Sequence, residues 1–147
     1  MSDKGPSPLT LKAMNFIHRS VIRLSLGRIG WMAAKMPVLE LTTTGRRSGL
    51  PRSVMLTSPY QESGSFLIVA SKGGSDTPPD WFLNIAKEPN VEVRFQGAPS
   101  VAMFAEIVDE YEHGRLWSMI VQDFSNYGNY QTKTSRVIQL VFLRPST

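Results

Sequence analysis

The chain has 147 residues and a mass of 16.4 kDa, which is the size of one ordinary domain. It contains no cysteine and only two histidines, which excludes disulfide scaffolds, thiol catalysis, zinc fingers, iron–sulfur clusters and a His-rich metal site. The net charge of +4 is unevenly placed: residues 1–52 carry nine Lys and Arg against two acids, and residues 53–147 carry seven against ten. This asymmetry indicates an anionic partner near the N-terminal third, either a phosphate-bearing cofactor, an anionic membrane face or nucleic acid.

Targeting and motif signals narrow the possibilities further. The N-terminus lacks the apolar region and cleavage site of a signal peptide, and no apolar stretch approaches the length of a membrane span. We therefore expect a cytoplasmic location. The sequence also lacks the G-x-G-x-x-G, P-loop, G-x-S-x-G and H-E-x-x-H motifs.

The N-terminal part is expected to form a loose tail over residues 1–8 and an amphipathic helix over residues 9–27. The helix ends where two glycines follow, and its apolar face is formed by Leu11, Met14, Ile17, Val21 and Leu24. Lys12, Arg19 and Arg23 lie on the opposite face. The helix either covers the body of the protein, closes over a site, or rests on a membrane surface through residues 9–28.

From residue 38 onward the pattern is mostly that of β-strands, with two short helices. Turns are expected at 45–49 and 62–65, and a polar, tyrosine-bearing segment at 123–135. The continuous apolar strand at 66–71 is expected to be buried on both faces. The expected strands are 38–44, 51–60, 66–71, 91–95, 101–108 and 137–143, and the expected helices are 80–88 and 110–122.

The start of the helix at 80–88 has its own signal. Asp76 or Thr77 is expected to cap it, with Pro78 and Pro79 at its first positions. Because tight turns join most consecutive strands, the fold is mainly β (α+β): about six antiparallel strands closing into a small barrel, with the N-terminal helix and two short helices. No linker or repeat divides the chain, so residues 1–147 are expected to form a single domain.

Three features suit one elongated ligand with an anionic tail and a flat ring. The turn at 44–52 carries three arginines within seven residues, and guanidinium groups and turn amides bind phosphate or carboxylate. At 71–74, two glycines let the backbone approach a ligand and Lys72 adds a charge. Trp81 and Asn84, three residues apart on a helix, offer an apolar wall and an amide. Each feature by itself also has a purely structural explanation: the turn is solvated, the glycines form a loop, and the tryptophan belongs to the core. The histidines suggest no catalysis: His18 is expected to be structural and His113 solvated.

Three segments carry a resemblance to a known family. LTTTGRRSGLPRSVML, LIVASKGGSDTPPDWFLNIAKEPNVEV and FSNYGNYQTKTSRVIQLVFL resemble the deazaflavin-dependent nitroreductase family. Its members are A-type, largely mycobacterial reductases of the split β-barrel superfamily, and they use reduced coenzyme F-420. The resemblance covers roughly residues 35–145.

The resemblance implies a split β-barrel with the deazaflavin bound in a groove. The phosphate and oligoglutamate tail would lie along the basic turn, with Lys72 assisting, on Arg46, Arg47, Ser48, Gly49, Leu50, Pro51 and Arg52. The ring would lie near Ser71, Gly73, Gly74, Trp81 and Asn84. Phe124, Tyr127 and Tyr130 match the spacing of the tyrosines that line the family's substrate pocket, although phenylalanine at 124 lacks the expected hydroxyl donor.

The function that the resemblance implies is hydride transfer from reduced F-420 to an electrophilic acceptor, such as an enone or lactone, a quinone or a nitroaromatic. The protein would position the two rings and stabilise the developing enolate. Tyr130 and Ser71, followed by Tyr127, are the candidate donors of a hydrogen bond or proton.

Other functions remain open at this stage. FMN or haem could replace F-420 on the same fold, although three arginines and a lysine fit a longer anionic tail than one phosphate. A non-catalytic module that carries a cofactor or docks on a membrane is a further alternative. Nucleic-acid binding is not expected, because the basic residues are not interleaved with stacking aromatics. The chain is expected to be a monomer or weak homodimer.

Overall fold

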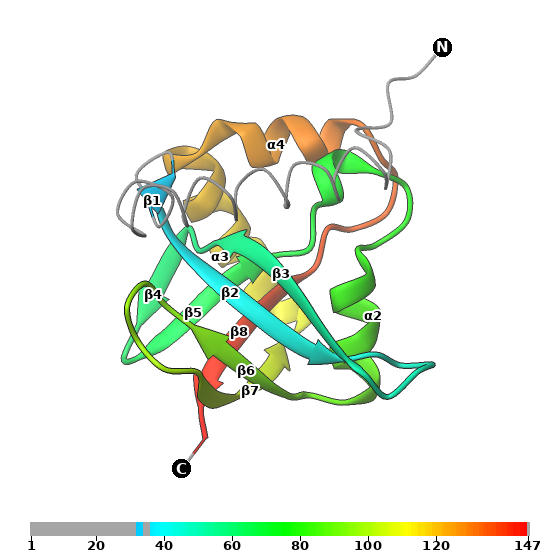
Figure 1. Cartoon of the computed structure of the whole chain (residues 1–147). Coiled ribbons are helices and arrows are strands. Elements are labelled where there is room, and N and C mark those ends of the chain that lie inside the picture. Colours follow the sequence, from blue (N-terminus) through cyan, green and yellow to red (C-terminus); the bar gives the residue numbers. More distant parts are fainter. Residues whose placement is uncertain (1–31, 34–35, 147) are drawn as a thin grey trace.

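The computed structural model describes residues 32–33 and 36–146, which form an antiparallel sheet with helices packed against it (Figure 1). The strands are β1 (Met32–Ala33), β2 (Met36–Thr44), β3 (Pro51–Thr57), β4 (Tyr60–Glu62), β5 (Ser65–Val69), β6 (Asn90–Arg94), β7 (Val101–Ile107) and β8 (Leu140–Pro145). The helices are the short 3-10 helix η1 (Lys72–Gly74), α2 (Asp80–Lys87), α3 (Glu110–Asp123) and α4 (Ser125–Thr132). The tail expected at 1–8 and the helix expected at 9–27 lie outside the described residues. None of the described helices has the length and apolar character needed to cross a membrane.

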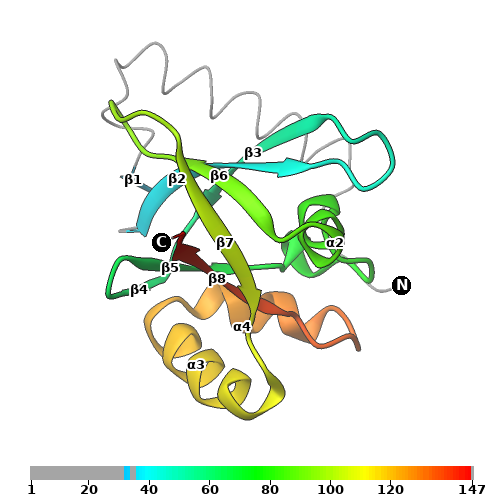
Figure 2. The ribbon, with the colours of Figure 1, turned by 90° about the horizontal axis from the view of Figure 1, so that it is seen from below.

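All eight described strands belong to one sheet, and every pairing is antiparallel. The order is β1-β2-β6-β7-β8-β5-β4, and β3 pairs with β2 off this path. The sheet curls, so that β2, β3 and β6 lie across from β5 and β8 (Figure 2). The split β-barrel of the α+β class is thus confirmed. The expected count of about six strands is too low, because β1 and β4 are too short to show an alternating pattern.

Most strand boundaries differ from the sequence prediction by about one to three residues, and two of these differences have a clear local reason. The segment 51–60 is not one strand: β3 ends at Thr57 and β4 begins at Tyr60. Pro59 lies between them and has no amide hydrogen to continue a ladder. The last strand begins three residues later than expected, because the amide of Ile138 donates to Oε1 of Gln131 at 3.0 Å instead of to a neighbouring strand.

The core has two parts that share strand β5. Ile68 and Ala70 face the inside of the barrel, where they join Trp81 of α2 and residues of β2, β6, β7 and β8. Leu67 and Val69 face the other way and pack with α3, α4 and β8. In Figure 2, α3 and α4 accordingly lie on one side of β5 and β8. The prediction that this strand is buried on both faces is confirmed.

The start of α2 differs from the prediction. Pro79 occupies the N-cap position and no side chain caps the helix, so neither Asp76 nor Thr77 is the cap. The hydroxyl of Thr77 instead accepts a hydrogen bond from Nζ of Lys72 at 3.2 Å. Asp80, the first helical residue, places its negative charge in the first turn, where the helix dipole favours it.

The polar segment at 123–135 contains the helix α4, which the sequence reading missed. Tyr127 is its one buried residue, so α4 has no repeating apolar stripe from which a helix is recognised. The described residues therefore form three α-helices rather than two. Phe124 ends α3 and precedes α4, and its ring packs on the second core cluster.

His113 is not solvated as expected. It is half-buried in α3, and its Nε2 lies 2.7 Å from the carbonyl oxygen of Ile138. Its ring also stacks on Trp117, with the ring centroids 5.7 Å apart. His113 therefore ties α3 to the segment before β8. His18 lies outside the described residues.

The contact between η1 and α4 requires glycine at position 74. Gly74 has a φ of +87°, and a Cβ built on it would lie 2.6 Å from the backbone oxygen of Tyr130 and 3.0 Å from Cβ of Lys133. Both the backbone conformation and the close approach of the helix exclude a side chain here.

We expect Gly74→Ala to lower the free energy of unfolding by more than Gly97→Ala. Gly97 also has a positive φ, +70°, but a Cβ added to it would have nothing within 4 Å. Gly97→Ala should therefore cost only the left-handed backbone penalty of about 1–2 kcal/mol, and Gly74→Ala should add about 1–3 kcal/mol of overpacking. Urea unfolding of both variants measures the difference, and equal losses would contradict the close contact.

Candidate functional site

A cavity of about 1070 Å³ lies between the turn after β2, strand β3, the loop after β5, and the helices α2 and α4. Its size matches the larger ligand pockets of proteins. The structure thus brings together segments that are far apart in the chain. Eleven of the residues singled out from the sequence line the cavity: Arg46, Arg47, Ser48, Arg52, Ser71, Lys72, Gly73, Trp81, Asn84, Tyr127 and Tyr130.

Five of the singled-out residues are not among those that line the cavity. Gly49, Leu50 and Pro51 are exposed at the tip of the turn, with Leu50 55% exposed. Gly74 is buried beneath α4, and Phe124 packs between α3 and α4. Their expected roles in ligand binding stay predictions.

The cavity also has lining residues that the sequence reading missed. Asn126 and Lys133 belong to the face of α4 that carries Tyr130, which lies four residues after the first and three before the second. Recognising the helix would have revealed this spacing. Apolar side chains of β3, among them Val54 and Leu56, also line the cavity.

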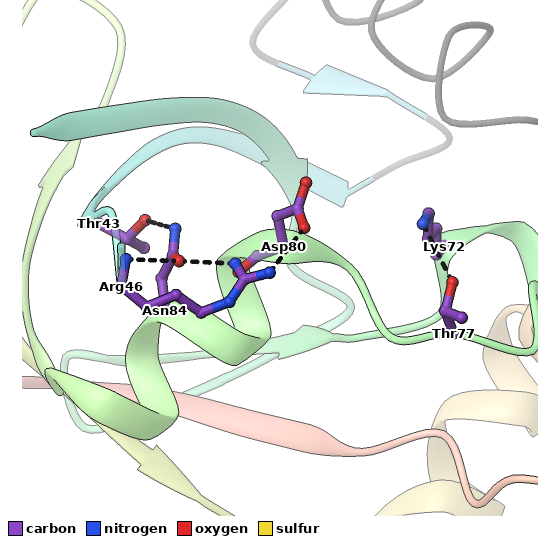
Figure 3. A network of polar contacts seen from close by, with 6 residues as sticks. All are labelled: Thr43, Arg46, Lys72, Thr77, Asp80 and Asn84. Atoms are coloured by element: carbon purple, nitrogen blue, oxygen red, sulfur yellow. Dashed lines mark hydrogen bonds and ion pairs between the residues drawn. The ribbon is translucent and has the colours of Figure 1, made fainter. Parts of the chain in front are cut away.

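The buried amide of Asn84 fixes the basic turn to α2 (Figure 3). Asn84 is 3% exposed, and its Nδ2 donates to the hydroxyl of Thr43 at 3.0 Å. Its Oδ1 accepts from the backbone amide of Arg46 at 3.1 Å and from Nη1 of Arg46 at 3.0 Å. One side chain therefore joins the end of β2, the turn and α2.

The guanidinium of Arg46 is bonded mainly to side chains of α2. Its Nη2 lies 3.4 Å from Oδ1 of Asp80, and its own carbonyl accepts from Nζ of Lys87 at 2.8 Å. Figure 3 shows the side chain lying along the start of α2. Arg46 thus holds the turn in place, whereas the other two arginines of the turn are less constrained.

Arg47 and Arg52 supply the available positive charge. Arg47 is exposed, and its side chain has no hydrogen bond or ion pair within the part of the chain that the structure describes. Among the described residues, the guanidinium of Arg52 has one hydrogen-bond partner, the hydroxyl of Ser48 at 3.4 Å. The cavity lining adds Lys72 and Lys133, against one carboxylate, that of Asp80. An anionic ligand group suits this wall.

Three residues of the loop after β5 line the cavity, namely Ser71, Lys72 and Gly73. Ser71 has right-handed helical torsions, and Lys72, Gly73 and Gly74 all have positive φ, of 45°, 63° and 87°. A right-handed residue followed by a left-handed one turns successive N–H groups toward one point, the concave arrangement called a nest. The amides of residues 71–73 have no hydrogen-bond acceptor among the described residues. They can therefore bind an electron-rich ligand atom.

Two tyrosines of α4 form the wall opposite the turn. Tyr127 is 6% exposed, and its hydroxyl lies 3.3 Å from Oγ1 of Thr57 and 3.6 Å from Sδ of Met36. Burial raises the pKa of Tyr127 although the Thr57 hydrogen bond opposes the shift, so the phenol stays protonated at neutral pH. Tyr130 packs edge-on against Tyr127, and its hydroxyl has no partner among the described residues. Tyr130 is thus the better placed donor.

We expect Asn84→Leu to lower the free energy of unfolding by about 1–3 kcal/mol, because the substitution leaves buried polar partners without a hydrogen bond. The matched control is Asn90→Ala: Asn90 is exposed and its side chain donates an exposed hydrogen bond to Glu88, so the substitution should cost about 0.5 kcal/mol or less. Urea unfolding monitored by tryptophan fluorescence measures both. If Asn84→Leu lowers the free energy of unfolding no more than the control does, Asn84 does not hold the turn against α2.

A family model and a similar protein of known name point to the same family. A family model described as F420H(2)-dependent quinone reductase matches residues 15–145. An F420H(2)-dependent quinone reductase of Mycobacterium tuberculosis (strain ATCC 25618 / H37Rv) is 37% identical over 132 residues, which are 86% of this chain and 87% of that protein.

Two solved structures share the fold and part of the sequence. The structure of an F420-H2 dependent reductase (FDR-A) is 33% identical with a TM-score of 0.63, and the match covers 74% of this chain and 94% of that one. A structure described as a domain-swapped dimer is 28% identical with a TM-score of 0.65, and the match covers 90% and 99%. The matched family model spans most of the chain, and this protein therefore belongs to the F420H(2)-dependent quinone reductase family.

Proposed function

We propose that this protein is a reductase that binds reduced coenzyme F-420 in the cavity and reduces a small electrophilic acceptor. A quinone is the preferred acceptor, and enones, lactones and nitroaromatics are the alternatives. Family membership supports the cofactor and the quinone, because matched relatives are named for both. The observation that carries the proposal is that one cavity holds two lightly engaged arginines, a nest of open amides and a tyrosine hydroxyl. These groups complement a ligand with an anionic tail and a flat, carbonyl-bearing ring.

The residues divide the binding of the cofactor between two ends of the cavity. Arg47 and Arg52 bind the phosphate and carboxylates of the tail, and Arg46 keeps the turn docked on α2. Trp81 would offer an apolar wall to the ring, and the amides of the loop 71–73 would offer hydrogen-bond donors to its carbonyl oxygens. Ser48, Gly49, Leu50, Pro51, Lys72, Gly74 and Asn84 complete the proposed cofactor site.

The acceptor binds on the α4 side of the same cavity, near Tyr127 and Tyr130, with Phe124 beneath them. The bound cofactor supplies a hydride from C5 of its reduced ring. Tyr130 holds a proton at its hydroxyl and donates a hydrogen bond to the acceptor oxygen that gains negative charge. Ser71 and Tyr127 are the further donors, and the apolar residues of β3 limit the access of water.

The N-terminal segment suggests where in the cell the protein acts. We propose a cytoplasmic protein whose residues 9–28, which lie outside the described residues, contact the anionic face of a membrane, and which is a monomer or weak homodimer. The support is the basic, amphipathic sequence of that segment. Sedimentation with anionic and with neutral vesicles tests the contact, and equal binding to both would overturn it.

Titration of the purified protein with F-420, FMN and FAD, followed by fluorescence, tests the cofactor. We expect saturable binding of F-420 that weakens as salt is added, because part of the affinity comes from charges at an exposed turn. Preferential binding of FMN would overturn the cofactor and the role of the arginines in holding a long tail. No binding of any of the three would overturn the proposed reductase.

We expect Arg47→Ala and Arg52→Ala each to weaken F-420 binding by about 5- to 30-fold at low salt, through loss of a charge-assisted hydrogen bond. The loss should shrink at high salt. Arg115→Ala is the matched control: it removes the same charge from α3, where Arg115 pairs with Glu112 and does not line the cavity. Equal effects of all three variants would show that only net charge matters.

We expect Tyr130→Phe to lower kcat for quinone reduction by about 10- to 100-fold, as befits loss of a positioned hydrogen-bond or proton donor. The affinity for F-420 should stay near that of the unaltered protein. Tyr111→Phe, at a residue that is 90% exposed on α3, serves as the control. An unchanged kcat would mean that water or another group supplies the hydrogen bond.

A further inference from the structure

Arg136 lies in the segment between α4 and β8 and reaches back to the loop after β5. Its three nitrogens donate to three different backbone oxygens: Nε to Ser75 at 2.8 Å, Nη1 to Ala70 at 3.2 Å and Nη2 to Ser71 at 2.9 Å. These oxygens belong to the loop whose residues Ser71, Lys72 and Gly73 line the cavity. Arg136 itself does not line the cavity, so it acts on the loop from behind.

The backbone on both sides of Arg136 is held by Gln131 of α4, whose Nε2 donates to the carbonyl of Thr134 at 3.3 Å on the N-terminal side. Nε2 of Gln131 donates to the carbonyl of Arg136 at 2.7 Å, and Oε1 of Gln131 accepts from the amide of Ile138 at 3.0 Å. The amide of Arg136 also donates to the hydroxyl of Thr134 at 3.3 Å. These hydrogen bonds fix the backbone from which the guanidinium of Arg136 extends. The position of the loop after β5 therefore depends on the position of α4.

The direction of the peptide groups places the amides opposite the guanidinium. In a trans peptide unit the C=O and N–H groups point in opposite directions. Because the oxygens of Ala70 and Ser71 face Arg136, the N–H groups of the same two peptide units, those of Ser71 and Lys72, face away from it. That is the side of the cavity, which Ser71, Lys72 and Gly73 line.

The charge of Arg136 is directed into these peptide groups. Its side-chain hydrogen bonds go to the three carbonyls, and Asp76 adds a longer-range attraction. A cationic donor on a peptide oxygen polarises the peptide unit and strengthens its N–H as a donor. Two consecutive amides of the nest gain donor strength in this way.

We propose that Arg136 is a positioning residue that shapes and polarises the amide nest at residues 71–73, so that the nest binds the electron-rich carbonyl edge of the ring of the cofactor. This inference rests on the proposed function, and it assigns to Arg136 a role at the ring end of the cavity, opposite to the role of Arg47 and Arg52 at the tail end. Each of the three carbonyl oxygens is bonded by a different nitrogen of the planar guanidinium, and an ammonium group has to donate all its hydrogens from one compact atom, which does not reproduce this spread.

The first experiment needs no ligand. Amide hydrogen exchange of the peptide covering residues 70–76 should be at least 10-fold faster in Arg136→Ala than in the unaltered protein. The matched control is Arg144→Ala, which removes a half-buried arginine of β8 bonded to Ser65 and Glu106 and absent from the cavity lining. It should leave exchange of that peptide unchanged. Unchanged exchange in Arg136→Ala would overturn the inference, whatever the cofactor is.

The second experiment separates the ring end from the tail end. The probes are F-420 and the deazaflavin ring with its sugar alcohol but without phosphate or oligoglutamate. Arg136→Ala should weaken both by about 10-fold, with little dependence on salt, because the half-buried nest acts through short-range hydrogen bonds and not through a free charge at an exposed turn. Arg47→Ala should weaken only F-420. Loss of affinity for F-420 alone in Arg136→Ala would overturn the inference.

Arg136→Lys keeps the charge and most of the volume, and it provides the test if the alanine variant fails to fold. We expect a stability near that of the unaltered protein and an affinity for the tail-less ring lowered by about 5-fold or more. Full affinity in the lysine variant would show that the charge alone suffices and would overturn the shaping role. If the unaltered protein binds neither probe, the proposed function fails, and the exchange experiment still decides whether Arg136 holds the loop.

Discussion

The arrangement of the cavity depends on the buried side-chain amide of Asn84. A buried amide without partners is costly, and Asn84 meets this requirement with Thr43 of β2 and with both the backbone and the guanidinium of Arg46. No strand pairing joins the basic turn to α2, so these hydrogen bonds fix their relative position. All three arginines of the turn line the cavity, and only the guanidinium of Arg46 is bonded to α2.

The opposite side of the cavity depends on α4 in a similar way. This helix supplies Tyr127 and Tyr130 to the wall, its approach to η1 requires Gly74, and Gln131 holds the segment from which Arg136 reaches the loop after β5. The nest of amides and the tyrosine hydroxyl are thus set by one helix. A movement of α4 would change both together, which couples the proposed ring site to the proposed acceptor site.

The arginines of this chain illustrate how structure divides one residue type among different tasks. Arg46 and Arg136 both direct their guanidinium groups at protein oxygens, the first at Asn84 and Asp80 and the second at backbone carbonyls. Arg47 and Arg52 keep most of their donors available. Guanidinium donors that are already satisfied add rigidity, and only those that remain open contribute directly to the binding of an anion.

The sequence by itself determined the fold class, the antiparallel pairing, most strand positions and the three segments that meet at the cavity. Strand alternation, glycine turns and the apolar run of β5 are local signals. Seven of the eleven predicted residues that line the cavity lie at the ends of these strands, and the other four belong to α2 and α4. The weakly amphipathic helix α4 and the short strands β1 and β4 had no comparable signal. Only the tertiary structure decided which cations are engaged, and that Arg136 reaches a loop more than 60 residues earlier in the chain. The physical reason is that hydrogen-bond partners distant in sequence are chosen by the packing of whole elements, which no local pattern of residues records.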